Sequence, residues 1–575
     1  MVAAWVLGPL GALLLALLLG WLQGAVAAVT RFRAACHHLH HFPRPPWRNW
    51  LLGHTGMGKN TEEGLQDVDQ LVARYRHGCL WWVSPWLPVL RLFHPDTLRP
   101  VLLASAFIAP KDKLFYGFLK PWLGDGLLLS HGDKWARHRR LLTPAFHFDI
   151  LKSYVSIFNS STHIMHAKWR AAAEAAGGAV ELNVLEHLSL LTLDSLQKCI
   201  FSHDSRCQEQ PSEYIKAILE LSTLVVRRHH RLLHHPSWLY RLSADGRRFA
   251  RACATVHNFT ANVVQRRRQA LNRLGHQAWL ESHQGRSMDF IDLLLLTKDE
   301  DGNTLSDEDI SAEADTFMFE GHDTTASGLA WLLYNLAHHP DYQERCRQEA
   351  CELLKGRDVV EVEWEDLSCL PFTTMCIKES LRLHPPVTAV SRRCTEDITM
   401  RDGRVIPKGV ICLMSIYGTH HNPDIWPEPQ VQPPLARLWD SGTSPSPVSP
   451  RHASALVTPG LQPAAVQPRE QPGTVPAGLH PLLRRAQVSH GGDAAVPVCH
   501  PPPGCPAHGD PGGRGGRNCI GQSFAMAELR VVAALTLARF AVRPDEGRPV
   551  RRKTELILRA EDGLWLRLEP LPEEA

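Results

Sequence analysis

The stretch from Ser306 to Pro340 constrains the fold most, because it predicts a single unbroken helix of unusual length. Ser306 with Asp309 three residues later resembles a capping box, which marks the start of a helix. Apolar and small residues then recur at helical spacing until Pro340, which would end the pattern. At 1.5 Å per residue this helix is about 50 Å long. We therefore expect a large, mainly helical domain that this helix crosses from side to side.

A glycine-rich loop near the C-terminus presents one cysteine, Cys519, between Gly515–Gly516 and Gly521. Glycine lets the backbone turn back sharply and aim amide N–H groups at the sulfur. Arg517, two residues before the cysteine, can reach a carboxylate such as a haem propionate. A plain turn is the commoner use of such a loop, but a protein also offers one thiolate to a haem iron in this way. The loop alone leaves both interpretations open.

The middle of the long predicted helix breaks the local rules for helices. Gly321 costs about 1 kcal/mol in a helix interior, and four polar residues, His322 to Thr325, follow it. The alternative is that these residues only face water, but apolar runs at Phe317–Phe319 and Leu329–Leu333 flank them and favour burial. Sites that violate helix propensity are more often functional than sites that obey it.

Three side chains near Gly321 share one face of this helix. Glu320, Asp323 and Thr324 are separated by three and four residues, which places them side by side. An acid and a hydroxyl beside a small residue are what is needed to pass protons to a ligand bound on iron. This face is therefore the second half of a predicted haem site.

Two further pairs fit a haem protein. Trp135 and Arg139, four residues apart, can direct an indole N–H and a guanidinium to carboxylates such as haem propionates. Glu379 and Arg382, three residues apart, predict a buried ion pair. Such spacings also arise on exposed helices. Their joint occurrence, in this order and upstream of Cys519, supports the haem interpretation.

The first thirty residues predict a membrane anchor. No charged side chain occurs from Val2 to Val29, and Arg31 and Arg33 follow. This run exceeds the roughly 20 apolar residues that span a bilayer. The alternative, a cleaved signal peptide, is disfavoured because a basic region before the apolar run is missing. We expect an uncleaved transmembrane helix over residues 2–29, a proline-containing hinge over 31–60, and the bulk of the protein in the cytosol.

Composition excludes several other classes of protein. The net charge is only +3, which does not suggest nucleic-acid binding. The 14 cysteines lack repeated spacing and would stay reduced in the cytosol, so we expect no disulfide framework. Two groups of histidines among arginines fit a solvated or membrane-facing basic surface better than a metal site. These groups are His37, His38, His40 and His41, and His229, His230, His234 and His235.

Taken together, these motifs resemble the cytochromes P-450, in the order that the family shows them. The resemblance implies a mainly α fold with small β-sheets, and extended segments are expected near 80–93, 398–414 and 556–568. Family 4, the fatty-acid ω-hydroxylases, is indicated by Phe317–Thr325, Gly132–Trp135, Leu141–Phe148 and Tyr417–Pro423. Its subfamily F, and within it the type that acts on ultra-long-chain fatty acids to form acylceramide, is indicated by Ser243–Phe249, Leu564–Leu566 and Glu569–Pro572.

The resemblance implies a role for each motif residue. Cys519 corresponds to the axial thiolate of haem b, and Asp323 and Thr324 to the proton-delivering pair. Glu320 stands where many family 4 enzymes form an ester with a haem methyl group, and Glu379 with Arg382 would brace the proximal side. The residues that would hold the propionates are Trp135, Arg139, Arg392 and Arg517.

The implied function is a monooxygenase that hydroxylates the terminal carbon of long or ultra-long fatty acids. Oxygen would come from O₂ and electrons from NADPH through a membrane-bound flavoprotein reductase, with the catalytic domain on the cytosolic side of the endoplasmic reticulum. The reductase would dock on a basic proximal face that includes Lys134, Arg137 and Arg140. An ordinary solvated helix face is the alternative for these charges.

One segment, Gln432 to Arg514, departs from the family. It holds 17 of the 42 prolines and has no Phe, Tyr, Ile, Lys, Met or Asn, a composition that reads as disordered. The phenylalanine that relatives place seven residues before the cysteine is Gly512, and Arg437 is a poor candidate for the arginine that joins Glu379 and Arg382. The haem domain would then comprise 61–431 and 515–575, with 432–514 as an atypical insertion.

This departure leaves two functional hypotheses and a minor third. The chain is either an active monooxygenase or a splice or gene-model variant that keeps the helices but binds haem poorly. A zinc or redox protein using Cys499 and Cys505 is disfavoured, because both lie in the atypical segment.

Overall fold

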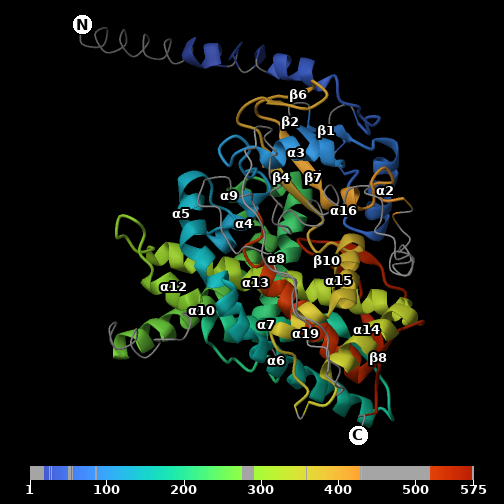
Figure 1. Cartoon of the computed structure of the whole chain (residues 1–575). Helices are drawn as coiled ribbons and strands as arrows, with labels where there is room; N and C mark the ends of the chain where they lie inside the picture. Colours follow the sequence, from blue (N-terminus) through green and yellow to red (C-terminus); the bar gives the residue numbers. More distant parts are fainter. Residues whose placement is uncertain are drawn as a thin grey trace, which may run out of the picture.

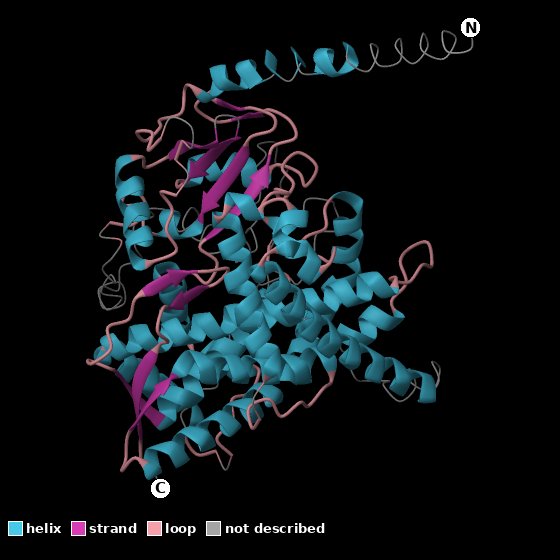
Figure 2. Ribbon diagram, turned by 180° about the vertical axis from the view of Figure 1, so that it is seen from behind, coloured by secondary structure: helices cyan, strands magenta, loops and turns pink. Residues whose placement is uncertain are grey.

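The computed structural model describes residues 19–572, except 25, 28, 31, 50–52, 55, 85–86, 211, 275–289, 358, 428 and 430–517. Helices form most of the body, and the strands gather at two places along its edge (Figures 1 and 2). The predicted segment 432–514, with Gly512 and Arg437, lies outside the described residues, and so does Arg517.

Helix α13 (Asp307–His338) runs through the centre of the body (Figure 1). Ser306 caps it as predicted, since its hydroxyl oxygen accepts a hydrogen bond from the Asp309 amide at 3.1 Å. The helix is buried along most of its length, and it packs on helices from both ends of the chain. These neighbours are α7 (Val184–Phe201), α10 (Ala244–Leu274), α15 (Pro371–Leu383) and α19 (Gln522–Arg539).

The other helices surround this central group, and most of them lie between residues 61 and 378, as predicted. They are α2 (Glu62–Arg74), α3 (Pro95–Leu103), α4 (Tyr116–Leu123), α5 (Gly132–Leu142), α6 (Phe148–Ala175), α8 (Glu213–His230), α9 (Ser237–Leu242), α12 (Phe290–Leu296), α14 (Pro340–Leu354) and α16 (Ile416–His420). Short 3₁₀ helices occupy Thr143–Phe146, Leu232–His234 and Glu365–Cys369.

The strands form one four-stranded sheet and three smaller ones, and all three predicted extended stretches contain strands. The largest sheet has the order β1 (Gly78–Ser84), β2 (Leu87–Leu92), β7 (Ile411–Ser415), β4 (Ala389–Arg393). Its β2–β7 pair is parallel and the other pairs are antiparallel. The smaller sheets contain β3 (Val180–Asn183) with β11 (Trp565–Pro570) and β8 (Phe540–Pro544), β9 (Arg552–Thr554) with β10 (Leu558–Ala560), and β5 (Ile398–Thr399) with β6 (Val405–Ile406).

Close packing at glycines brings other elements against α13. A Cβ atom on Gly321 would lie 2.6 Å from a Leu196 methyl carbon of α7, so only glycine fits the present approach of α7 to α13. A Cβ on Gly126 would lie 2.7 Å from the Ala312 carbonyl oxygen. The helix-breaking Gly321 of the sequence is therefore a packing device as well as a local irregularity.

Residues 19–39 are largely helical and project from the body near the four-stranded sheet (Figure 1). Trp21 is 71% exposed there. Among the described residues, no helix is both long enough and apolar enough to cross a membrane. Most of the predicted anchor at 2–29, including residues 2–18, lies outside the described ranges, so the anchor stays a prediction.

Candidate active site

The buried stretch of α13 is interrupted near the middle of the helix. From Ala312 to Leu333, every residue is buried except Glu320, Gly321 and Thr324. Glu320 and Thr324, one turn apart on one helical face, keep accessible surface and border an opening in the packing, whereas Gly321 packs against Leu196 of α7. The sequence prediction of a functional site at this point of the helix agrees with this exposure pattern.

Glu320 and Thr324 are linked through the helix backbone. The Thr324 hydroxyl donates to the Glu320 carbonyl oxygen at 2.8 Å, as hydroxyls in helices often do. Although the Glu320 side chain keeps some accessible surface, protein surrounds its carboxyl group, and this burial raises its pKa to about 7. Lys111 opposes the shift, while Glu313 adds to it. A carboxyl group with this pKa can hold or release a proton near neutral pH.

Cys519 lies just before the N-terminus of α19, where Gly521 is the N-cap. Its residue surface is exposed, yet the thiol lies deep enough that burial raises its pKa to about 11. The sulfur is therefore largely enclosed by protein, while the residue as a whole keeps accessible surface. The charge on Glu320 also raises the thiol pKa, which places these two side chains within electrostatic reach of each other.

Two groups favour a thiolate at Cys519. The Gly521 amide N–H, which hydrogen-bonds to the sulfur, and the Arg139 guanidinium both lower the pKa of the thiol. The predicted use of loop amides around the sulfur is therefore present in the structure. A metal cation at the sulfur would add the charge that makes a thiolate the stable form.

Arg139 also connects α5 to the cysteine loop. Its guanidinium donates to the Asn518 carbonyl oxygen at 3.2 Å and to the Asn518 side-chain oxygen at 2.8 Å. Trp135, one turn earlier on α5, is half-buried against the hydrophobic core. The structure therefore joins Arg139 to the cysteine loop through Asn518, a partner that the sequence did not indicate, and the role of Arg139 and Trp135 toward a propionate stays a prediction.

Arg392 of β4 is also buried, and it has a different set of contacts. It donates to the Ser391 carbonyl oxygen at 2.8 Å and lies beside Tyr116, where its charge opposes the rise in the Tyr116 pKa that burial causes. Within the described part of the chain, no contact joins Arg392 to Arg139 or Cys519. Its role toward a propionate stays a prediction.

Asp323 has a partner that the sequence did not reveal. Both of its carboxylate oxygens accept hydrogen bonds from Arg559 of β10, at 2.5 and 2.7 Å, and both side chains are buried. The two residues are 236 positions apart, so no local spacing rule could have paired them. Arg559 thus holds Asp323 in a buried position, whereas Thr324 borders the opening.

The predicted ion pair between Glu379 and Arg382 is confirmed. Arg382 donates to the Glu379 carboxylate at 2.6 and 2.9 Å and is almost wholly buried. Its remaining N–H groups reach the carbonyl oxygens of His420 and Pro429, and its guanidinium lies 4.8 Å from the Trp426 ring centre. These groups satisfy Arg382 among the described residues.

The three cations of the face predicted to dock a redox partner each pair with an acidic residue, and the docking itself stays a prediction. Lys134 pairs with Asp309 at 2.7 Å, Arg137 with Asp299 at 2.8 Å, and Arg140 with Glu300 at 2.8 Å. Acidic residues far away in sequence neutralise these side chains, which spacing on a single helix cannot show.

The histidine groups also differ from a uniformly solvated surface. His229 packs against Phe115, with ring centres 5.3 Å apart, and burial lowers its pKa to about 4. It is therefore neutral at physiological pH, contrary to the predicted basic surface. Within the ranges that the structure describes, no cluster of His, Cys, Asp or Glu could hold a metal ion.

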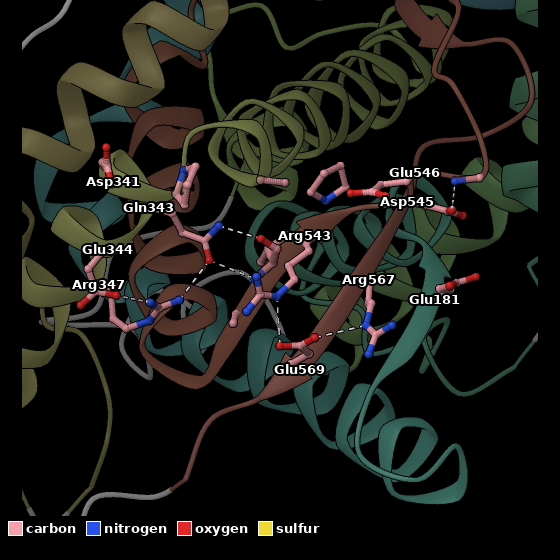
Figure 3. A pocket seen from close by; sticks show the side chains of 16 residues that line it. Glu181, Asp341, Gln343, Glu344, Arg347, Arg543, Asp545, Glu546, Arg567 and Glu569 are labelled. Carbon is pink, nitrogen blue, oxygen red and sulfur yellow. Dashed lines mark hydrogen bonds and ion pairs between the residues drawn. The ribbon is translucent and has the colours of Figure 1, made fainter.

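A pocket of about 770 Å³ opens elsewhere, between α14, β8 and β11 (Figure 3). Its charged side chains largely pair with one another: Glu569 accepts from Arg543 at 3.1 Å and from Arg567 at 3.2 Å. None of the predicted site residues lines it. The candidate site formed by Cys519, Glu320 and Thr324 is therefore separate from this pocket.

The candidate site thus combines a cysteine thiol at the start of α19 with Glu320 and Thr324 on one face of α13. The family model described as Cytochrome P450 matches residues 43–434 and 511–566. The chain belongs to the cytochrome P450 family. The break in the match, between 434 and 511, overlaps the segment that the sequence marks as atypical.

Several cytochrome P450 relatives resemble this chain over nearly its whole length. The ultra-long-chain fatty acid omega-hydroxylase of Homo sapiens is 57% identical over 544 residues, which make up 95% of this chain and 91% of that protein. Cytochrome P450 4F3 of Homo sapiens is 54% identical over 562 residues, 97% of this chain and 96% of the relative. Leukotriene-B4 omega-hydroxylase 3 of Mus musculus is 54% identical over 535 residues, 93% and 90% of the two chains.

Membership of the cytochrome P450 family makes the chain a haem-dependent monooxygenase that works with a redox partner. The residues present fit a haem: one accessible thiol has an amide N–H directed at its sulfur, and an arginine lies beside it. The accessible residues Glu320 and Thr324 of α13 would border such a haem. The thiol and the carboxyl group influence each other electrostatically, so both border one site.

Proposed function

We propose that this protein hydroxylates the terminal carbon of long or ultra-long-chain fatty acids at the membrane of the endoplasmic reticulum, with electrons from NADPH through a flavoprotein reductase. The observation that carries the proposal is the joint placement of the Cys519 thiol and the accessible Glu320–Thr324 face. The names of relatives that are 54–57% identical support the reaction and the substrate class.

Cys519 is the proposed axial ligand, and Arg139 is the proposed neighbour of a propionate. A haem bound there supplies the oxygen activation that permits one atom of O₂ to enter a C–H bond. Arg139 lowers the pKa of the thiol, which favours the ligating thiolate. Trp135, Arg392 and Arg517 are the other proposed propionate residues, and Arg517 lies outside the described residues.

Thr324 and Asp323 are the proposed proton-delivering residues. The Thr324 hydroxyl donates backward to the Glu320 carbonyl, which fixes its side chain and leaves its oxygen lone pairs toward the opening. Arg559 holds the Asp323 side chain in place through two hydrogen bonds, from where it is proposed to accept protons and pass them on. The pair can therefore carry protons inward without exposing the site to bulk water.

Glu320 is proposed to form the ester with a haem methyl group. Burial keeps this carboxyl group partly protonated near neutral pH, and its position bordering the opening suits such a link. A tether at this point would stiffen the pocket and favour attack on the end of a chain. Under acidic organic extraction, haem should stay with the wild-type polypeptide and separate from Glu320→Ala. Separation from both would show that no tether forms.

Substrate class is tested with a series of fatty acids of increasing length in the reconstituted system. Mass spectrometry of the products should find the hydroxyl group at the terminal carbon, with turnover retained for ultra-long chains. A matched reaction with leukotriene B4 separates the two functions named among the relatives. Hydroxylation at internal carbons, or activity toward leukotriene alone, would contradict the proposal.

A second candidate is a form that keeps the fold but binds haem weakly. It is supported by the interruption of the family match between 434 and 511 and by the absence there of the expected phenylalanine. Loss of one packed aromatic side chain typically costs about 3–5 kcal/mol. The carbon-monoxide difference spectrum of the unmodified chain should then be weak, and replacing residues 432–516 by a family-like connector should restore it. A full spectrum in the unmodified chain would reject this candidate.

A further inference from the structure

Two buried polar atoms between α8, α10 and α13 have no hydrogen-bond partner. They are the hydroxyl oxygen of Tyr214 and the Oδ1 atom of Asp315, in side chains whose residues are 2% and 5% exposed. Around them lies the main apolar cluster, which includes Val256 and Ile218. Buried polar atoms are nearly always satisfied, by protein or by ordered water, so these two indicate a hydrated polar link within apolar surroundings.

Asp315 connects this link to the surface. Its Oδ2 atom lies 3.6 Å from Nε2 of His257, whose side chain is 42% exposed. The same Nε2 atom lies 2.7 Å from the Trp122 carbonyl oxygen, which fixes the imidazole ring in place. Burial raises the pKa of Asp315 to about 6, although the His257 charge opposes the shift. A carboxyl group of this kind exchanges protons readily at neutral pH.

Tyr214 connects Asp315 to the active-site side of α13. Its ring centre lies 6.2 Å from that of His322, the residue before Asp323. Charges on both Asp315 and Asp323 raise the pKa of Tyr214, so both carboxylates act electrostatically on this hydroxyl group. These carboxylates are two helical turns apart on α13, about 12 Å along the axis. The tyrosine from α8 therefore lies where it can bridge them.

Other titratable groups near Asp315 do not continue toward the site. The groups facing it from the helices packed against it are His257 and Cys253 of α10 and Tyr214 of α8. Burial and Asp315 raise the pKa of Cys253 to about 12, so it stays a thiol. His257 leads outward to solvent, and Tyr214 is the group that leads inward.

We infer that His257, Asp315 and Tyr214 form a proton path from solvent to Asp323, resting on the proposed role of Asp323 and Thr324 in delivering protons. A solvent proton enters at the His257 imidazole and passes to the Asp315 carboxylate. Ordered water and the Tyr214 hydroxyl carry it on: the hydroxyl oxygen accepts one proton while it releases its own toward Asp323. Each transfer returns the donor to its starting form, so no charge accumulates. None of the three residues needs to touch the substrate, so they act through Asp323.

The first test measures turnover in the complete reconstituted enzyme. In Asp315→Asn and Tyr214→Phe, hydroxylated product per NADPH oxidised should fall by about 100-fold, the low end of the range for positioned proton-transfer groups. The solvent deuterium isotope effect should rise, while the carbon-monoxide spectrum stays unchanged. Tyr240→Phe is the matched control, because Tyr240 is also buried with an unpartnered hydroxyl but belongs to α9. Equal coupling in Tyr214→Phe and Tyr240→Phe would overturn the path.

The second test needs no turnover, so it decides the path even if the protein hydroxylates no fatty acid. Infrared spectroscopy of the holoenzyme should show a protonated-carboxyl band that Asp315→Asn removes and that titrates near pH 6 in the wild type. His257→Gln and Tyr214→Phe should each shift its frequency or its midpoint, because the charge or polar group of each neighbour acts on Asp315 in the proposed path. A band that neither substitution changes would overturn the proposal, whatever the enzyme's activity.

Discussion

Cys519 and Cys376 are both thiols whose pKa is raised, yet their surroundings differ. Cys376 of α15 lies in the core with its sulfur 3.7 Å from that of Cys346 of α14, and contact with Cys346 together with burial raises its pKa. Cys519 retains exposed surface, and Gly521 and Arg139 act on it in favour of the thiolate. A raised pKa therefore does not separate a structural thiol from a ligand. Arg345 also acts on Cys376, so a nearby cation does not separate them either; what separates them is an open side and an amide donor.

The largest effect is expected from removing the accessible thiol. Cys519→Ala should abolish the thiolate-type carbon-monoxide spectrum and all hydroxylation, because a methyl group cannot ligate iron. Cys376→Ala, the matched control, should keep the spectrum. Both are measured by difference spectroscopy of purified protein. A thiolate spectrum that survives in Cys519→Ala would remove the distinction between the two cysteines.

A smaller effect is expected from removing the cation. Arg139→Leu deletes the hydrogen bonds to Asn518 and the charge that favours the thiolate. Hydrogen bonds from charged groups contribute about 1.5–3 kcal/mol, so haem retention should weaken by about 10- to 150-fold. The measurement is haem transfer to an excess of apomyoglobin. The control, Arg140→Leu, removes an exposed pair with Glu300 and should retain haem as the wild type does.

Removing Cys376, the buried structural thiol, should change only the free energy of unfolding. Cys376→Ala removes a buried sulfur beside Cys346 and should lower the free energy of unfolding by about 1–2 kcal/mol. Cys351→Ala, at a partly exposed position of α14, should change it by less than about 0.5 kcal/mol. Chemical denaturation monitored by circular dichroism gives both values. A loss of haem ligation in Cys376→Ala would show that the core pair also supports the site.

The smallest effect concerns the charge on Glu320. Because that charge raises the pKa of Cys519, Glu320→Gln should speed alkylation of the Cys519 thiol in haem-free protein by less than about tenfold. Glu320 titrates near pH 7, so the two proteins should react alike at low pH. As pH rises through 7, Glu320 ionises, and the wild type should fall behind the variant. Peptide mapping by mass spectrometry follows Cys519, and a difference independent of pH would contradict this account.

Features that depend on neighbours in sequence were predictable. The Ser306 cap fixes the start of α13, and the three-residue spacing of Glu379 and Arg382 gives a real ion pair. In both cases the helix itself sets the geometry, so sequence spacing translates directly into distance. The same reasoning located the irregular face around Gly321.

Features that depend on contacts between elements far apart in the sequence were not predictable. The partner of Asp323 is Arg559, and the cations of the predicted basic face pair with Asp299, Glu300 and Asp309. The path through His257 and Asp315 joins two helices whose approach only the fold defines. Spacing rules describe single elements, whereas these contacts depend on which elements meet.

The tie between Arg139 and Asn518 has a consequence for how the chain is built. Residues 518–572 are attached to the rest by contacts of their own: Arg139 binds Asn518, α19 packs against α6, α13, α14 and α15, and β11 pairs with β3. The covalent connection from Pro429 to Asn518 is therefore not what positions this C-terminal piece. The protein therefore resembles an assembly of two parts within one chain. Two separately synthesised fragments, divided between Pro429 and Asn518, should bind each other and reassociate.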